Sequence, residues 1–465
     1  MNAHHPATTR APFRQAVAPD AADPPPWTAR IPRNWVYGAH PMRRTTARSV
    51  LVLFALSLTA CEPPAVSPTP VMVIARDANG QYRPQQVQVR SLTRPVTLEG
   101  TVARFLGAGR VVQDPEDPAL QNVATYEQLA DAILKNEGSP VRAHLYNQSG
   151  VMWPADYHSW NMATAYYLVE RAADYFRDTS SVPESALDQT PIYYFPDVRF
   201  NGSQEAERDN AFYVSLLDGL LFVPEKDIET VPLALNRGVM VHEYSHRIFN
   251  KLVHRGALMP EALTRWDTVG STQGINVLQS LNEGLADYHA VSESCRSALE
   301  GGYGCDTRFL ADTFGEELAN ERDLALESRQ CLSEALWVAV RDENHNDFTG
   351  RGAHYQVGTV IATALWQAGQ KTGQQHAMEQ AVLDAYADPD LNNPGLAELI
   401  EASLADQTQF TLGAALDRIV AHVSDPPLRD AVCGELMDQV GLDRSVLPSC
   451  YASAQVDGTC QRGPR

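Results

Sequence analysis

The feature that most constrains this chain is the pattern His-Glu-x-x-His, formed by His242, Glu243 and His246. Apolar residues flank the pattern at helical spacing, so we expect it to lie on a helix. Residues four apart lie one turn apart on the same face, and both imidazoles can therefore reach one ion. Glu243 projects from the same side and can contact a water molecule on that ion. A catalytic zinc needs three protein ligands and one open position, so a third ligand must come from elsewhere in the chain.

The segment 279–290 offers this third ligand. In it, Glu283 and Asp287 are again four residues apart on a predicted helix. One carboxylate can bind the metal ion while the other accepts the N–H of a ligating histidine and fixes its tautomer. Two buried carboxylates that face each other are unfavourable unless a cation lies between them. A solvated acidic face is the alternative for this segment taken alone, but beside the histidine helix it favours a metal site.

The two segments together, His-Glu-x-x-His and Asn-Glu-x-x-x-Asp, resemble the gluzincin metallopeptidases of the thermolysin and fungalysin type. The resemblance implies a Zn²⁺ ion held by His242, His246 and Glu283. It also implies that Asp287 lies behind one histidine and that Glu243 is the general base.

Two further segments extend the resemblance to roughly residues 155–370. Segment 210–213, Asn-Ala-Phe-Tyr, is similar to the family's edge-strand motif, which implies that Asn210 and Ala211 bind the main chain of the substrate. Segment 354–358, His-Tyr-Gln-Val-Gly, resembles the family's His-x-x-x-Gly helix and implies a transition-state role for His354.

The chain departs from the family pattern in two places. Residues 253–280 contain no tyrosine, although thermolysin-like enzymes have one there that helps to stabilise the oxyanion. This leaves the oxyanion to His354 or to another donor such as Tyr355. The β-rich region 84–124 is also too short for the large inhibitory propeptide expected of the family.

The N-terminus carries a predicted export signal. A basic stretch begins at Met42, an apolar run follows at 50–58, and Leu-Thr-Ala-Cys ends at Cys61. These are the parts of a secretory signal peptide, too short to span a bilayer. The last four residues resemble the bacterial lipobox, which implies a lipid on Cys61; a plain signal peptide is the alternative. We therefore expect residues 1–41 to be a misassigned extension and the mature protein to be lipid-anchored in the bacterial cell envelope, on its periplasmic or outer-membrane face.

Composition agrees with export. The cysteines other than Cys61 all follow the histidine helix; they are Cys295, Cys305, Cys331, Cys433, Cys450 and Cys460. An even number of cysteines in an oxidising compartment predicts disulfide bonds, with a pairing that the sequence leaves open. The net charge of −20 argues against nucleic acid as a partner and against a basic patch on anionic lipid.

The hydrophobic pattern predicts an α+β fold. The resemblance implies two zincin-like lobes with the zinc site in the cleft between them. The expected parts are a signal peptide at 42–60, a tether at 61–83, a small β-rich region at 84–124, a mixed N-terminal lobe with the histidine helix at 125–252, and a helical, disulfide-stapled C-terminal lobe at 253–465. Residues 125–178 are expected to be helical, and strands are expected at 191–195, 211–214 and 220–223.

These features predict a zinc-dependent endopeptidase acting on a peptide or protein substrate, because an edge strand suits a peptide that runs through the cleft. One alternative is a catalytically silent, zinc-containing surface lipoprotein that binds peptides. Another is an exopeptidase of the same fold. Glu243 favours catalysis, because a structural zinc site has no need of this carboxylate and fills its fourth position with protein.

Overall fold

The computed structural model describes residues 67–460 with gaps at 115, 122, 124–125, 181, 229, 257–271, 300–303, 326–329, 342–351, 387–392, 406–409 and 452. The predicted extension at 1–41, the signal peptide at 42–60 and Cys61 lie outside the described residues. Within the described part of the chain, no helix combines the length and apolar character needed to cross a membrane.

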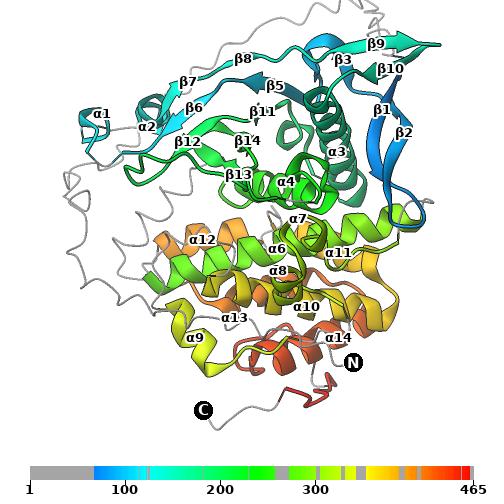
Figure 1. The fold of residues 1–465 in the computed structure, drawn as a ribbon. Helices are drawn as coiled ribbons and strands as arrows, with labels where there is room; N and C mark the ends of the chain where they lie inside the picture. Colours follow the sequence, from blue (N-terminus) through cyan, green and yellow to red (C-terminus); the bar gives the residue numbers. More distant parts are fainter. Residues whose placement is uncertain are drawn as a thin grey trace, which may run out of the picture. The chain divides into compact units, whose positions relative to one another are not determined.

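The described strands all lie before residue 223 and form three sheets (Figure 1). The largest has the order β13-β14-β11-β5-β4-β3, with β8 paired to β5; the others have the orders β2-β1-β10-β9 and β12-β6-β7. The strands are β1 (Thr69–Arg76), β2 (Tyr82–Val89), β3 (Leu92–Arg94), β4 (Glu99–Gly100), β5 (Ala103–Gly107), β6 (Arg110–Val112), β7 (Leu134–Asn136), β8 (Ser139–Pro140), β9 (Leu145–Gln148), β10 (Val151–Pro154), β11 (Thr190–Tyr194), β12 (Asp197–Arg199), β13 (Ala211–Val214) and β14 (Gly219–Phe222). The strand β13 therefore ends the largest sheet.

The described residues after 253 form helices and loops without strands. The α-helices of the chain are α1 (Pro118–Gln121), α2 (Tyr126–Ile133), α3 (Tyr157–Thr179), α4 (Arg237–Leu252), α6 (Thr272–Leu299), α7 (Ala311–Phe314), α8 (Glu316–Glu321), α9 (Glu334–Arg341), α10 (Ala353–Thr372), α11 (Gln375–Asp384), α12 (Leu396–Ala405), α13 (Leu412–His422) and α14 (Pro426–Glu435). Short 3₁₀ turns are η2 (Pro95–Thr97), η3 (Glu184–Ala186), η4 (Ser215–Leu217) and η5 (Leu233–Leu235), and α14 continues into the π-helical turn η7 (Leu436–Val440).

The N-terminal part of this fold differs from the prediction. The predicted tether at 61–83 is wrong from the start of β1 onward, because β1 pairs with β2 along its whole length. Val71 and Val73 of β1 are buried, and the Asp77 carboxylate accepts two backbone N–H groups of the turn that follows. The β-rich region 84–124 is not a separate part either. Its strand β5 pairs with β11, and β1 pairs with β10.

The predicted helical stretch 125–178 is confirmed only at α2 and α3, and strands β7 to β10 lie between them. β9 and β10 are joined at Ser149 and Gly150, which have positive φ angles of 54° and 86°. Two successive residues of this kind form the tight turn of a β-hairpin. The predicted strands β11, β13 and β14 are confirmed.

The helices α3, α4, α6 and α10 pack one on the next in this order, with α3 beside the strands and α6 and α10 below them in Figure 1. α3 packs on β1 and on α4, while α4 also contacts β13. The backbones of α6 and α10 touch: a Cβ atom on Gly284 would lie 2.4 Å from the carbonyl oxygen of Gly358. This close crossing brings the segments around Glu283 and Tyr355 together.

The cysteines after the histidine helix form disulfide bonds, as their even number predicts. The pairs are Cys295–Cys305, Cys331–Cys460 and Cys433–Cys450. The Cys331–Cys460 bond joins residues 129 apart in sequence and so ties the C-terminal segment to the residues before α9.

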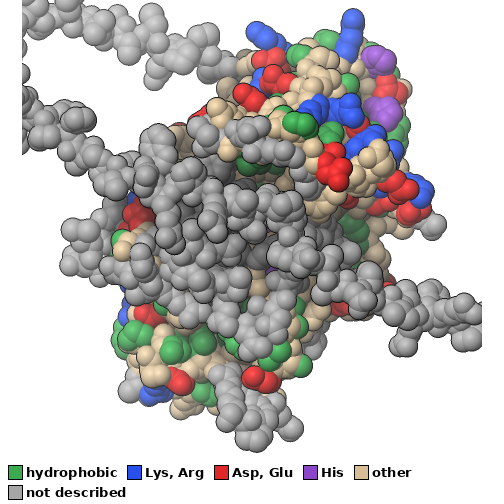
Figure 2. Space-filling model, turned by 90° about the vertical axis from the view of Figure 1, so that its left-hand side faces the viewer, with side chains coloured by type: hydrophobic (Ala, Val, Ile, Leu, Met, Phe, Trp, Pro, Cys, Tyr) green, Lys and Arg blue, Asp and Glu red, His purple; other side chains and the backbone are tan. Residues whose placement is uncertain are grey.

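Acidic and basic side chains are mixed on the strand-bearing part of the surface. Figure 2 shows both kinds next to each other over the upper part of the molecule. Ion pairs among the strands include Arg104 with Glu137 at 3.3 Å and Arg110 with Asp197 at 3.2 Å. Exposed pairs of this kind each contribute at most about 1 kcal/mol, so the buried core dominates stability.

Candidate metal centre

The helix α4 is fixed at its start by a capping residue. The Asn236 side chain accepts the N–H of Val239 at 3.2 Å and donates to the carbonyl oxygen of Phe309 at 2.7 Å. Gly238 lies so close to the same Phe309 that a Cβ atom would be 2.2 Å from its side chain. On the far side of α4, the buried Arg247 donates to Asp218 at 3.1 Å, in the turn between β13 and β14. These contacts fix the histidine pattern relative to β13.

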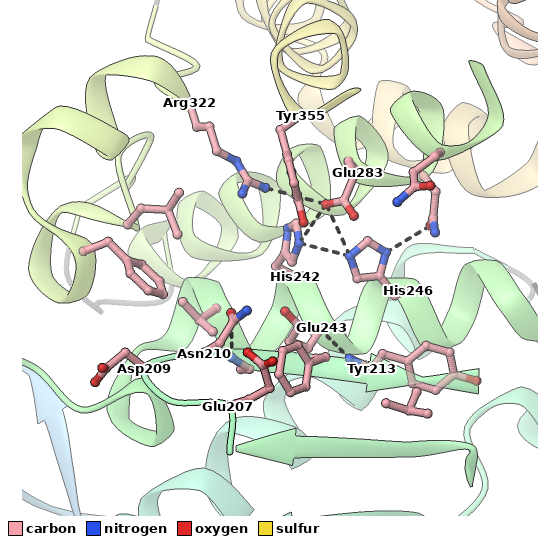
Figure 3. Close-up of a pocket in the computed structure, with 18 of the residues that line it drawn as sticks. Glu207, Asp209, Asn210, Tyr213, His242, Glu243, His246, Glu283, Arg322 and Tyr355 are labelled. Atoms are coloured by element: carbon pink, nitrogen blue, oxygen red, sulfur yellow. Dashed lines mark hydrogen bonds and ion pairs between the residues drawn. The ribbon is translucent and has the colours of Figure 1, made fainter. Parts of the chain in front are cut away.

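The three predicted metal ligands converge in the structure (Figure 3). The Nε2 atoms of His242 and His246 are 3.0 Å apart. The Oε2 atom of Glu283 lies 3.4 Å from Nε2 of His242 and 3.6 Å from Nε2 of His246. All three side chains are largely buried. This His-His-Glu group could bind a metal ion.

The polar side chains behind the two histidines fit a bound cation. Nδ1 of His242 lies 2.9 Å from Oδ1 of Asp287, and Nδ1 of His246 lies 3.1 Å from Oδ1 of Asn282. If both Nδ1 atoms carry the proton, both Nε2 atoms present lone pairs to the same space. Oε2 of Glu283 faces this space too and has no hydrogen bond among the described residues. Three lone-pair donors repel one another unless a cation lies between them, and an N,N,O set suits Zn²⁺.

Arg322 forms an ion pair with Asp287 behind the predicted metal ligands. Its guanidinium donates to both oxygens of Asp287, from Nε at 2.9 Å and from Nη2 at 2.5 Å. Burial raises the pKa of Asp287, but Arg322 and His242 outweigh burial and hold it below its ordinary value. Burial likewise opposes ionisation of Glu283, whereas the two histidines hold its pKa well below the usual range. Both carboxylates are therefore ionised at neutral pH.

Glu243 lies on α4 between the metal ligands and β13. Its Oε2 atom accepts the backbone N–H of Tyr213 at 2.7 Å, so the edge strand holds the carboxylate in place. Burial raises the pKa of Glu243 above its ordinary value, although the histidines oppose this shift. A carboxylate with a raised pKa is a stronger base and suits proton transfer near neutral pH.

A cavity of about 550 Å³ lies beside these residues. The predicted substrate residues Asn210 and Ala211 line it, as do Glu243 and the three predicted metal ligands. Apolar side chains form another part of the wall; they are Val239, Phe309, Leu310, Phe314 and Leu318. The cavity can therefore accept both the main chain and an apolar side chain of a ligand.

His354 lies away from the place that the sequence predicts for it. The residue is 1% exposed and is not part of the cavity wall, whereas Tyr355 lines the cavity. His354 and Gly358 are four residues apart and share the face of α10 that packs on α6, while Tyr355 is turned away from that face. In Figure 3, Tyr355 points toward His242 and Glu283.

Two residues of the site, Asn282 and Arg322, are not among the residues that the sequence predicted for it. Asn282 directly precedes Glu283 in the Asn-Glu-x-x-x-Asp segment, so its place in that motif could have identified it. Arg322 follows α8 and belongs to no motif. Its guanidinium lies over the Tyr355 ring, 5.0 Å from the ring centroid. Its role follows only from the tertiary contact with Asp287.

No family model matches the sequence, and no curated protein matches it. Among solved structures, the precursor of protealysin, a metalloproteinase from Serratia proteamaculans, is similar to this chain with a TM-score of 0.41 and 12% sequence identity. The match covers 76% of this chain and 89% of that chain.

Proposed function

We propose that this protein is a zinc-dependent endopeptidase with its active site in the cavity between β13 and the metal ligands. One observation carries the proposal: a buried His-His-Glu group lies next to a glutamate that is fixed against an edge strand, and all of them line one cavity. A purely structural zinc site would not need Glu243 or the cavity. The two-lobed arrangement expected from the sequence belongs to this proposal, with the cavity as its cleft.

The edge strand supports a peptide as the substrate. Antiparallel strands point alternate residues toward their neighbour and away from it. The N–H of Tyr213 points away from β14, toward Glu243, and the carbonyl of Asn210 accepts the N–H of Val223. Ala211 has the same orientation as Tyr213, so its carbonyl group points toward the cavity. An extended peptide can pair with it by β-strand addition.

Each residue of the site has its own role in the proposed reaction. When bound, Zn²⁺ supplies a Lewis acid that polarises the scissile carbonyl and acidifies water. Glu243 removes the proton from the attacking water and later delivers it to the leaving amine. Asp287 and Asn282 hold the two histidine rings, and Arg322 keeps Asp287 ionised. The Tyr355 hydroxyl donates a hydrogen bond to the oxygen that becomes negative in the transition state.

The Tyr355→Phe substitution is expected to lower kcat about 10²- to 10³-fold, the usual effect of losing one oxyanion donor. Phe keeps the ring beneath Arg322, so KM and zinc content should change little. His354→Gln is the matched neighbour and should leave kcat within about threefold of the parent protein, because His354 does not line the cavity. A large loss of kcat in the His354→Gln variant, with no loss in the Tyr355→Phe variant, would show that His354 and not Tyr355 stabilises the oxyanion.

Endopeptidase activity is tested with an unfolded protein such as casein and with product mapping. Incubation with the zinc-loaded protein should give internal fragments, which mass spectrometry identifies by their ends. Release of single terminal residues or dipeptides would instead indicate an exopeptidase. No cleavage by a protein that holds one zinc ion would favour the silent peptide-binding lipoprotein.

We further propose that the protein is exported and anchored by a lipid on Cys61. The N-terminal sequence supports this proposal. Expression in a lipoprotein-processing bacterium should give a mature N-terminal peptide that begins at Cys61 and carries the mass of a diacylglyceryl group. Cys61→Ser should abolish this mass and release the protein from membranes. An N-terminus at another residue with an unmodified Cys61 would refute the anchor.

A further inference from the structure

The Glu207 carboxylate of the cavity wall has no partner among the described residues. Glu207 lies in the loop before β13, lines the cavity and is partly buried. Among the described residues its side chain forms neither an ion pair nor a hydrogen bond, and burial alone raises its pKa. In Figure 3 the Glu207 carboxylate points into the cavity beside Asn210, whereas Asp209 points away.

The other charged groups near Glu207 are engaged or solvated. Oδ1 of Asp209 accepts the backbone N–H groups of Lys226 and Asp227 at 2.6 and 3.0 Å. Arg322 binds Asp287, and Arg208 is exposed. A half-buried carboxylate without a counter-charge is destabilised by the loss of hydration. A cation that enters the cavity would therefore stabilise the ionised Glu207 more than it would stabilise a carboxylate that is already paired.

We infer that Glu207 selects substrates that carry a cationic group, either a lysine or arginine side chain or a free α-ammonium group. The inference rests on the proposed peptidase function and names the substrate class of the same site. A charge-assisted hydrogen bond from an ammonium or guanidinium group would satisfy the Glu207 carboxylate.

From the residues of the cavity wall we expect the preference for a cationic group to act at one substrate position only. Toward the other end of β13, Tyr213 donates to the side chain of Asn250 at 3.3 Å, and the neighbouring lining residues Gln279 and Asn282 are uncharged. His254 also lines this part, and burial lowers its pKa to about 4, so it is neutral at pH 7. Outside the metal site, and among the described residues of the wall, a cation therefore meets an unpaired negative charge at the Glu207 end.

The test measures peptide binding in the absence of turnover. Zinc-loaded protein with the Glu243→Gln substitution is titrated with fluorescent peptides that carry one Lys, Arg, Gln or Glu at each position in turn, and affinity is read from anisotropy. At one position, Lys and Arg peptides should bind about tenfold more tightly than the Gln peptide, the effect of one charged hydrogen bond. Adding Glu207→Gln should abolish this preference, and adding Glu207→Lys should reverse it toward the Glu peptide. Glu205→Gln is the matched control, because Glu205 is exposed and does not line the cavity.

Acetylation of the peptide N-terminus separates the two sources of the cation. A loss of peptide affinity of about tenfold on acetylation identifies the α-ammonium group as the cation, whereas an unchanged affinity identifies the side chain. Either result supports the inference if Glu207→Gln removes the preference for the cationic peptide. Equal affinity for Lys, Gln and Glu peptides at every position would overturn it. So would a preference that survives Glu207→Gln. Casein cleavage by the protein with Glu243 intact is scored separately, so a failed preference and a failed peptidase function give different results.

Discussion

Replacing Glu243 with glutamine is expected to lower kcat for peptide hydrolysis about 10²- to 10⁴-fold, the contribution of a positioned general base. Gln cannot accept a proton from water at neutral pH. Its side-chain oxygen can still accept the N–H of Tyr213, which Glu243 accepts at 2.7 Å, so the geometry of the site should be kept. KM and zinc content should therefore remain close to those of the parent protein. Steady-state kinetics on a quenched peptide and metal analysis measure both quantities.

The control for this substitution is Glu205→Gln, which makes the same chemical change at an exposed position outside the cavity wall. Its kcat should equal that of the parent protein. If Glu243→Gln retained full activity with one zinc ion bound, Glu243 would not be the base. If the variant lost zinc as well, the lower activity would report metal loss instead of proton transfer.

Removal of the metal ion is expected to abolish hydrolysis and to lower the stability of the folded protein. Without the ion, the ligand atoms of His242, His246 and Glu283 lie within 4.8 Å of one another in a buried space with no cation to hold them together. A ligand that binds only the folded state stabilises it by about 4 kcal/mol when its concentration is 1,000 times Kd. Addition of a strong chelator should therefore lower Tm, and added Zn²⁺ should restore both Tm and activity.

His246→Ala provides the control for the metal experiment. It removes one ligand but leaves the ion pair between Arg322 and Asp287 in place. This variant should be inactive, should hold little zinc, and should show no change of Tm on addition of chelator. A chelator effect on Tm of the same size in parent and variant would place the stabilising ion at another site.

Much of the candidate site could be predicted from the sequence because its geometry is local. His242 and His246 are one helical turn apart on α4, and Glu283 and Asp287 are one turn apart on α6. Hydrogen bonds between residues four apart in sequence fix this spacing whatever the rest of the chain does. The structure brings the two pairs together, with Nδ1 of His242 2.9 Å from Asp287.

The less local features of the fold were harder to predict. The parallel pairing of β1 with β10 joins Val71 to Met152, and no periodicity within either segment reveals it. The predicted tether was wrong for this reason, and so was the predicted helical stretch 125–178 where strands β7 to β10 lie between α2 and α3. Disulfide pairing also depends on contacts between distant segments. Cys331 and Cys460 can bond only because the fold brings these two parts of the chain together.

The sequence by itself identified the candidate metal ligands, the proposed general base and the helices that carry them, because these follow from spacing within single helices. Tertiary structure decided which further side chains reach the cavity. The contact of Gly284 with Gly358 sets the crossing of α6 and α10, which buries His354 and exposes Tyr355 to the cavity. Arg322 and Glu207 reach the site from a helix end and a loop. Their positions depend on packing between distant segments, which the local sequence pattern does not encode.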